Sequence, residues 1–161
     1  MNRKYFITYL WTFTWDIIVW LIVMMTWFFF GTKLHWQNGL WCELKRGSVV
    51  SRIWKCSGVT LGHGGIYNYG CSGGDGVDTK TERHELIHVE QYEVSMLVSF
   101  VAGNFIFWSD VSLASLTIGS MFWTLGWGIV YGASMLQAWL RGENYYRGNI
   151  MEESAYSQAE E

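Results

Sequence analysis

The sequence predicts a mainly α-helical protein that is anchored in a membrane, with a few short strands before its central helix. Two long apolar regions, residues 5–31 and 94–140, are separated by a polar, glycine-rich segment over residues 32–80. Half of the 161 residues are hydrophobic, 18% are aromatic, eleven are tryptophan and none is proline. Soluble domains carry fewer aromatic residues and about 5% proline, so this composition favours a chain in contact with lipid.

Charge and cysteine content argue against two common classes of protein. The formal net charge is −3, so we expect no broad basic surface and no nucleic-acid partner. The three cysteines, Cys42, Cys56 and Cys71, form no CxxC pair, which argues against a zinc ribbon. An odd number leaves at least one thiol outside any disulfide within the chain, whereas a single disulfide stays open as an alternative.

The N-terminal run from Tyr5 to Gly31 is long enough for a transmembrane helix, which needs about 20 mostly apolar residues. It lacks the small-residue cleavage site of a secretory signal peptide, so we interpret residues 1–31 as a retained anchor. Asp16 interrupts this run, and a carboxylate at such depth is costly unless it faces protein or water. We expect Asp16 to face a neighbouring helix, with a proton relay as the alternative.

The second apolar region, residues 94–140, is too long for one crossing and predicts a helical hairpin. Polar residues near its middle divide it into arms over 94–108 and 111–140. The first arm is short for a bilayer at about 1.5 Å per residue, unless it continues a helix that begins earlier. Gly128 and Gly132 have GxxxG spacing, which lets another helix approach closely. Packing within the chain is our default interpretation of this pair, and a partner helix is the alternative.

The segment between the apolar regions predicts short strands and loops. β-branched residues bounded by glycines over 47–62 favour short strands. The glycine-rich stretch over 68–78 favours a loop. We interpret residues 32–161 as one domain that includes the apolar hairpin over 94–140.

The stretch RHELIHVEQYE, residues 83–93, carries the most specific pattern in the chain. Residues 79–82 fit a capping box, so a helix should begin there. On this helix His84 and His88 lie one turn apart on the same face, where two imidazoles can bind one zinc ion. Glu85 follows the first histidine and is placed to act as a general base. The alternative is an amphipathic helix that carries two surface histidines.

A catalytic zinc site usually has three protein ligands and a water, so a third ligand has to come from elsewhere in the chain. His35 and His63 are candidates from the middle segment. The C-terminal stretch NIMEESAYSQAEE offers Glu152, Glu153 and Glu160 on a segment that can be helical. The alternative for these acidic residues is a solvated tail.

The stretches GVTLGHGGIY, RHELIHVEQYE and YYRGNIMEESAYSQAE carry a resemblance to a known family. The chain resembles HExxH metallopeptidases of the zincin type, and most of all small membrane-associated proteins with an HExxHxxQ pattern and a later Glu-x-x-Ala helix. This resemblance implies a zincin-like domain with bound Zn²⁺. By the same resemblance His84, His88 and Glu152 would be the metal ligands. Glu85 would be the general base, and Gln91 would lie near the site.

The hairpin also bears on where such a site would form. It supplies an even number of crossings, so it returns the C-terminal stretch to the side of the membrane that holds the two histidines. Most basic residues flank the apolar segments on that side, which predicts a cytoplasmic site by the positive-inside bias. The alternative is an exterior site, which the glycine-rich, cysteine-containing loop would suit equally well.

These features predict a membrane-associated, zinc-dependent metallopeptidase that hydrolyses peptide bonds near the bilayer. Its expected partners are membrane lipids and a peptide or membrane-protein substrate, which would pair with the strand near Gly58–Tyr67. A further helix could pack on Gly128 and Gly132. The alternative is a metal-stabilised structural or assembly subunit of a larger membrane complex, without catalysis. A closed four-ligand site would favour this alternative, whereas an open position for water would favour the enzyme.

Overall fold

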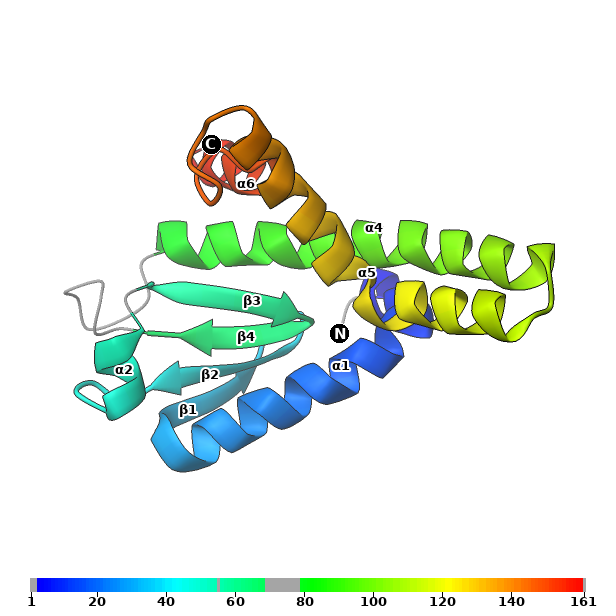
Figure 1. The fold of residues 1–161 in the computed structure, drawn as a ribbon. Coiled ribbons are helices and arrows are strands. Elements are labelled where there is room, and N and C mark those ends of the chain that lie inside the picture. Colours follow the sequence, from blue (N-terminus) through cyan, green and yellow to red (C-terminus); the bar gives the residue numbers. More distant parts are fainter. Residues whose placement is uncertain (1–2, 55, 69–78, 161) are drawn as a thin grey trace. The chain divides into compact units, whose positions relative to one another are not determined.

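The computed structural model describes residues 3–54, 56–68 and 79–160. The structure is mainly helical, with long apolar helices and a small sheet (Figure 1). Two compact units divide the chain. One consists of Met1–Trp15 and Glu90–Ser154, and the other of Asp16–Val89 and Ala155–Glu161.

Three helices pass from one unit into the other without a break. They are α1 (Arg3–Phe30), α4 (Thr79–Ser109) and α6 (Ile150–Ala159). The predicted central helix is present as α4, which is described from Thr79 onward.

A four-stranded sheet in the order β1-β2-β4-β3 forms the centre of the unit that contains residues 16–89 (Figure 1). β1 (Gly31–Trp36) and β2 (Leu40–Leu44) pair antiparallel, and β2 runs parallel to β4 (Gly64–Tyr67). β4 pairs antiparallel with β3 (Gly58–Gly62), which is therefore an outer strand of the sheet.

Two glycines permit a close approach between the start of β2 and the turn that joins β3 to β4. Gly64 has a φ of 153°, and a Cβ atom there would lie 2.2 Å from the carbonyl oxygen of Leu40. Gly39 has a φ of 156°, and a Cβ atom there would lie 2.3 Å from the carbonyl carbon of His63. Only glycine combines this backbone conformation with so little space. Both residues therefore help to fix the parallel register of β2 and β4.

The prediction of strands over residues 47–62 is wrong for its first half. Residues 49–53 form a short helix, α2 (Val49–Ile53). The hydroxyl of Ser48 accepts a hydrogen bond of 3.1 Å from the amide of Ser51 and so caps the first turn. This capping interaction outweighs the preference of the two valines for a strand.

The single strand expected near Gly58–Tyr67 is in fact two strands, β3 and β4. The chain reverses at His63, between two glycines with positive φ. Of the predicted loop over 68–78, only Asn68 lies within the described residues.

The second half of α1 buries one stripe of side chains in the same unit. Asp16, Val19 and Val23 are fully buried and recur at helical spacing. The indole of Trp20 donates a hydrogen bond of 2.9 Å to the carbonyl oxygen of His63. The other faces of this half expose large apolar side chains: Ile17, Ile18, Leu21, Ile22, Met24, Met25, Phe28 and Phe29. Exposed apolar surface of this kind marks a contact with lipid or with another protein.

Asp16 has a different partner from the one expected. Its Oδ2 lies 2.8 Å from Nδ1 of His63, and its Oδ1 accepts a hydrogen bond of 3.2 Å from the amide of the same residue. Neither side chain is exposed. The expectation of a neighbouring helix is therefore wrong, because the turn between two strands supplies the donors that a buried carboxylate requires.

The other unit contains the predicted helical hairpin (Figure 1). Its first arm is the C-terminal part of α4, and its second arm is α5 (Leu113–Leu140). Ser112 begins the second arm with a capping box, in which Ser112 and Ser115 each accept from the other's amide. The core of this unit is formed by Tyr92, Met96, Trp127 and Met151, with Trp11, Trp15, Val130 and Tyr131 packed against it.

Small residues bring the two arms of the hairpin together. A Cβ atom at Gly126 would lie 2.3 Å from Cβ of Ser99, and one at Gly119 would lie 2.8 Å from the Gly103 carbonyl oxygen. By contrast, no described atom lies within 4 Å of a Cβ atom at Gly128 or Gly132. The interpretation that this GxxxG pair packs within the chain is therefore wrong, because α5 turns a different face toward α4.

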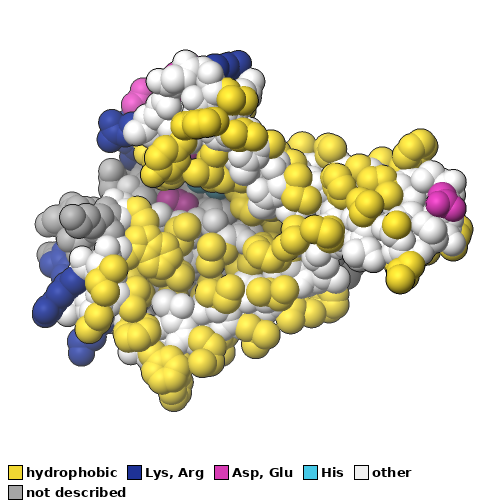
Figure 2. Space-filling model, viewed as in Figure 1, with side chains coloured by type: hydrophobic (Ala, Val, Ile, Leu, Met, Phe, Trp, Pro, Cys, Tyr) yellow, Lys and Arg dark blue, Asp and Glu magenta, His cyan; other side chains and the backbone are white. Residues whose placement is uncertain are grey.

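Two helical segments are long and apolar enough to cross a membrane, namely Thr8–Phe30 and Leu113–Leu140. Hydrophobic side chains cover much of the α4–α5 hairpin in Figure 2. Those of α4 include Val94, Val98, Val101 and Phe105, each more than half exposed. Length and composition thus agree with the prediction of a membrane protein.

Candidate metal centre

His84 and His88 form a buried pair on the first half of α4. Their Nε2 atoms lie 3.2 Å apart, and their ring planes are nearly perpendicular. Their exposed fractions are 8% and 5%, which contradicts the alternative of two surface histidines. The pair arises from the i, i+4 spacing alone, since such residues share one face of a helix.

Glu85 lies on the side of α4 that meets the sheet. Oγ1 of Thr60 on β3 lies 2.8 Å from Oε2 of Glu85 and can donate a hydrogen bond to it. The same hydroxyl lies 2.9 Å from the backbone oxygen of Glu85. A Cβ atom at Gly58 would lie 2.7 Å from Oε1, so the glycine leaves room for the carboxylate. The outer strand therefore fixes the orientation of Glu85.

Side chains of the sheet also pack against this part of α4. Trp41 and Tyr67 stack with ring centroids 4.6 Å apart, and Val89 completes their buried cluster. Val89 lies next to His88, so the packing of Val89 sets the rotation of α4 about its axis. That rotation determines which way both histidines point.

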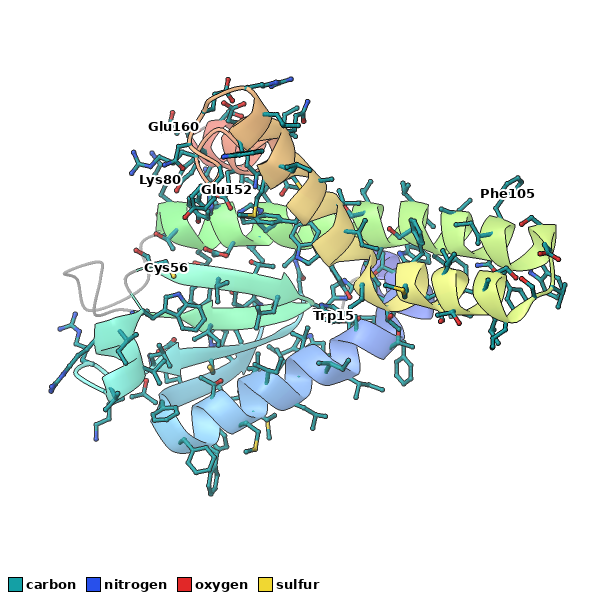
Figure 3. All side chains as sticks on the ribbon, viewed as in Figure 1. Trp15, Cys56, Lys80, Phe105, Glu152 and Glu160 are labelled. Carbon is teal, nitrogen blue, oxygen red and sulfur yellow. The ribbon has the colours of Figure 1, made fainter. Side chains whose placement is uncertain are left out.

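Glu152 lies in the first turn of α6 and is only 2% exposed (Figure 3). The hydroxyl of Tyr131 on α5 donates a hydrogen bond of 2.6 Å to its Oε1. Asn149, which is fully buried, precedes the helix and accepts a hydrogen bond of 2.9 Å from the amide of Met151. This capping interaction explains why α6 begins at Ile150 and why Glu152 is in its first turn.

α4 contacts α6 at Met151, just before Glu152, and again at Tyr156, just after it. In one unit the Gln91 side chain donates a hydrogen bond of 2.9 Å to the carbonyl oxygen of Met151. In the other, the rings of His84 and Tyr156 have centroids 4.4 Å apart. One ligand atom from each of His84, His88 and Glu152 lies within 4.8 Å of the other two. These three residues form a group that could hold a metal ion.

The other candidates for a third ligand have different partners. Nδ1 of His63 is engaged with Asp16, and Nδ1 of His35 lies 3.9 Å from a carboxylate oxygen of Glu43. Glu160 accepts a hydrogen bond of 2.8 Å from Lys80, and both side chains are labelled in Figure 3. That hydrogen bond and the charge of Lys80 hold the pKa of Glu160 below its ordinary value. Glu153 is exposed on α6 and belongs to no such group among the described residues.

The cysteine on β2 belongs to no candidate metal-binding group among the described residues. Cys42 is completely buried, and burial together with the neighbouring charge of Glu43 raises the pKa of its thiol to about 12. At neutral pH the Cys42 thiol is therefore protonated.

Comparison with protein-family models, with curated proteins and with solved structures gives no match for this chain. The chemistry of the site therefore follows from its own residues. Two imidazole nitrogens and one carboxylate oxygen are ligands typical of a zinc site with three protein ligands.

Two residues that contact the predicted site residues were not predicted from the sequence. Thr60 contacts Glu85, and Tyr131 contacts Glu152. Thr60 resembles any other threonine of a strand. Tyr131 also carries no distinctive signal, because α5 contains several other hydroxyl side chains.

Proposed function

We propose that this protein is a membrane-associated zinc metallopeptidase. In this proposal His84, His88 and Glu152 hold the ion and Glu85 is the general base. The observation that carries the proposal is the 3.2 Å distance between the two Nε2 atoms. With zinc–nitrogen bonds of 2.0–2.1 Å and tetrahedral angles, two histidine ligands are separated by about 3.3 Å. The separation of the two imidazole nitrogens agrees with that expected for two ligands of one zinc ion, which supports the proposal.

The environment of the three residues supports the same proposal. All three are buried, which strengthens charge interactions and excludes competing water. The hydrogen bond from Tyr131 orients the Glu152 carboxylate, as residues behind a metal ligand commonly do. Among the described residues, the group has three members, so a coordination position is left for water or substrate.

Bound zinc would polarise the scissile carbonyl and lower the pKa of a water molecule toward neutrality. Glu85 would accept a proton from the attacking water and later pass it to the leaving amine. The contact with Thr60 keeps the carboxylate in one orientation for both transfers. An extended peptide could add to the outer strand β3, because β3 pairs on one side with β4.

The substitution Glu85→Gln tests the proposal most directly. It preserves shape and removes the base, so zinc content and folding should persist while peptide hydrolysis falls by about 10²- to 10⁴-fold. Glu90→Gln is the matched control, because Glu90 is exposed on the same helix. Both variants would be assayed with a mixed peptide library and a direct measurement of bound zinc. Equal cleavage by wild type and Glu85→Gln, with zinc bound to both, would refute the proposed role.

The alternative is a metal-stabilised subunit of a larger membrane complex. Its support is the face of α5 at Gly128 and Gly132, which no described residue covers. It predicts a fourth protein ligand and no cleavage by the wild-type chain. The zinc coordination number, measured by X-ray absorption with and without a peptide-like inhibitor, distinguishes the two functions.

The proposal places the site on the cytoplasmic side. Basic residues are concentrated around the central segment and the end of α5, whereas only Arg3 and Lys4 precede the first apolar run. The positive-inside bias then assigns the central segment to the cytoplasm.

A further inference from the structure

Thr60 on the outer strand β3 connects this strand to the proposed general base. Its hydroxyl lies 2.8 Å from Oε2 of Glu85 and 2.9 Å from the backbone oxygen of the same residue. A hydroxyl carries one proton, so it donates to one of these two oxygens at a time. An ionised carboxylate is the stronger acceptor, so the donation goes to Oε2 when Glu85 is charged. One side chain of the sheet thus links the Glu85 carboxylate to the backbone of α4.

The carboxylate of Glu85 has little room to compensate for a shift of β3. A Cβ atom at Gly58 would lie 2.7 Å from Oε1 and 2.9 Å from Cδ of Glu85, so the strand backbone lies against the carboxylate. Glu85 is also only 5% exposed. β3 therefore contacts this side chain at two points, Gly58 and Thr60, and a displacement of the strand displaces the carboxylate. Misplacement of a catalytic group by about 1 Å can cost about 10²-fold in rate.

The position of Thr60 depends on how β3 is held. The strand is five residues long, has a glycine at each end and pairs with β4 alone among the described strands (Figure 1). Thr60 lies opposite Gly65, and Gly62 lies opposite Gly64. Leu61 is therefore an extra residue in β3, directly after Thr60. Such a bulge bends a strand and re-aims the side chains beside it.

A short strand that is paired on one side belongs to the parts of a fold that open most easily. Residues 58–61 of β3 are partly exposed, so a binding partner can reach the strand. An extended peptide on its outer edge would add a second row of backbone hydrogen bonds. These bonds would restrict the motion of β3 and, with it, the motion of the Thr60 hydroxyl.

We propose that an extended peptide bound along β3 aligns Glu85 through Thr60. The site then acts on peptide segments at least as long as β3 and is slow toward shorter peptides. Thr60 is a positioning residue in this scheme, because it acts through Glu85 and not on the substrate. The inference rests on the proposed peptidase function, and it adds the class of substrate and the way in which substrate binding activates the site.

Hydrogen exchange at β3 tests the binding step without catalysis. The full-length protein with zinc is mixed with a library of peptides of about eight residues, long enough to span β3, whose central amide is reduced to an uncleavable methylene amine. Amide exchange of residues 58–62 should slow about tenfold at a library concentration about ten times its apparent Kd. The corresponding reduced dipeptides should leave it unchanged. Equal exchange with and without the long library would overturn the inference, whether or not peptides are cleaved.

The change of kcat with peptide length tests the coupling to Glu85. The wild-type chain should cleave the long peptides with a kcat about 10- to 100-fold above that for dipeptides, since a hydrogen bond to a charged group is worth about this factor. Thr60→Val keeps the shape of the side chain and removes the hydroxyl, so it should lose this increase while its zinc content and KM persist. Thr60→Ser keeps a hydroxyl and should restore the increase.

Thr32→Val is the matched control. Thr32 lies on β1, at the other edge of the sheet, and its hydroxyl donates a hydrogen bond of 3.3 Å to the backbone oxygen of Glu43. This variant should behave like the wild type at both peptide lengths. An equal loss of kcat in Thr60→Val at both lengths, or no loss at either, would overturn the coupling and leave the peptidase intact. Absence of cleavage by the wild type at both lengths would refute the peptidase and the coupling together, and the exchange experiment would still show whether peptides bind β3.

Discussion

Tyr131 donates a hydrogen bond of 2.6 Å to Oε1 of Glu152, so a residue of the apolar helix α5 orients the carboxylate at the candidate metal centre. Glu152 lies 21 residues further along the chain, on α6, and is almost completely buried. The helix that is long enough to cross a membrane therefore also positions a predicted metal ligand. Changes in α5 should reach the metal centre through this contact.

Tyr131→Phe should weaken zinc binding while leaving the fold intact. Loss of a hydrogen bond to a metal ligand typically lowers metal affinity by about 10- to 100-fold. Zinc affinity would be measured by competition with a chromophoric chelator. Tyr145→Phe is the control, because Tyr145 is exposed, and it should bind zinc like the wild type. Unchanged affinity in Tyr131→Phe would show that Glu152 does not depend on this contact or is not a ligand.

His88→Ala should abolish stoichiometric zinc binding. The wild-type protein should contain about one zinc ion per chain, and removal of one of three ligands leaves an incomplete site. His35→Ala should keep its zinc, because His35 lies near Glu43 and stacks on Tyr67. Metal content after dialysis at neutral pH checks both results. Retention of zinc in His88→Ala would place the metal elsewhere.

Asp16→Leu should destabilise the protein more than the double change Asp16→Leu with His63→Phe. The single change removes one member of a buried, hydrogen-bonded pair and strands the other, which typically costs about 3–5 kcal/mol. Replacing both members with apolar residues removes the stranded imidazole, so the His63 amide is the one group that loses its acceptor in both variants. Thermal unfolding in detergent would measure the difference. Additive effects of the two substitutions would contradict coupling between these side chains.

Alanine at two glycines of α5 should have opposite effects. Gly128→Ala should stabilise the helix by about 1 kcal/mol, because no described residue limits a Cβ atom there. Gly126→Ala should destabilise the hairpin by about 1–3 kcal/mol, since the new Cβ atom would overlap Ser99. Unfolding in detergent compares the two variants. Destabilisation by Gly128→Ala would indicate a partner helix on that face.

The protein should remain in the membrane fraction after alkaline and high-salt washing. Two helical segments are long and apolar enough to cross a bilayer, and such segments are not extracted by salt. Salt would remove a protein that is held by charge alone. Immunoblots of the pellet and supernatant after each wash would measure the distribution. Release into the supernatant would mean that the apolar faces contact protein instead of lipid.

Local sequence determined the helices and the histidine pair. Residues 79–109 form the helix α4, within the region where the capping pattern and the histidine spacing predict a helix. The turn at Asp110–Ser112 divides the long apolar region into two arms as its polar residues predict. His84 and His88 face the same way because four residues make about one helical turn. These features depend on contacts within a few residues, which the sequence displays directly.

In the middle segment two local signals compete, because Val49 and Val50 favour a strand whereas the Ser48 cap favours a helix, and residues 49–53 form a helix. The order β1-β2-β4-β3 follows from close approaches at Gly39 and Gly64, between segments more than twenty residues apart. Strand pairing of this range leaves no periodic signal in the sequence.

The resemblance to HExxH proteins implied Glu152 as the third ligand, and the tertiary structure shows how the acidic candidates at the C-terminus differ. Glu152 is buried beside Tyr131, whereas Glu153 is exposed and Glu160 pairs with Lys80. All three lie on or next to one short helix, and the residue types around them do not indicate which one would bind a metal. The sequence by itself determined which residue types could bind a metal and which residues share a helix face. The tertiary structure decided which of them meet, because burial and hydrogen bonding depend on segments that are distant along the chain.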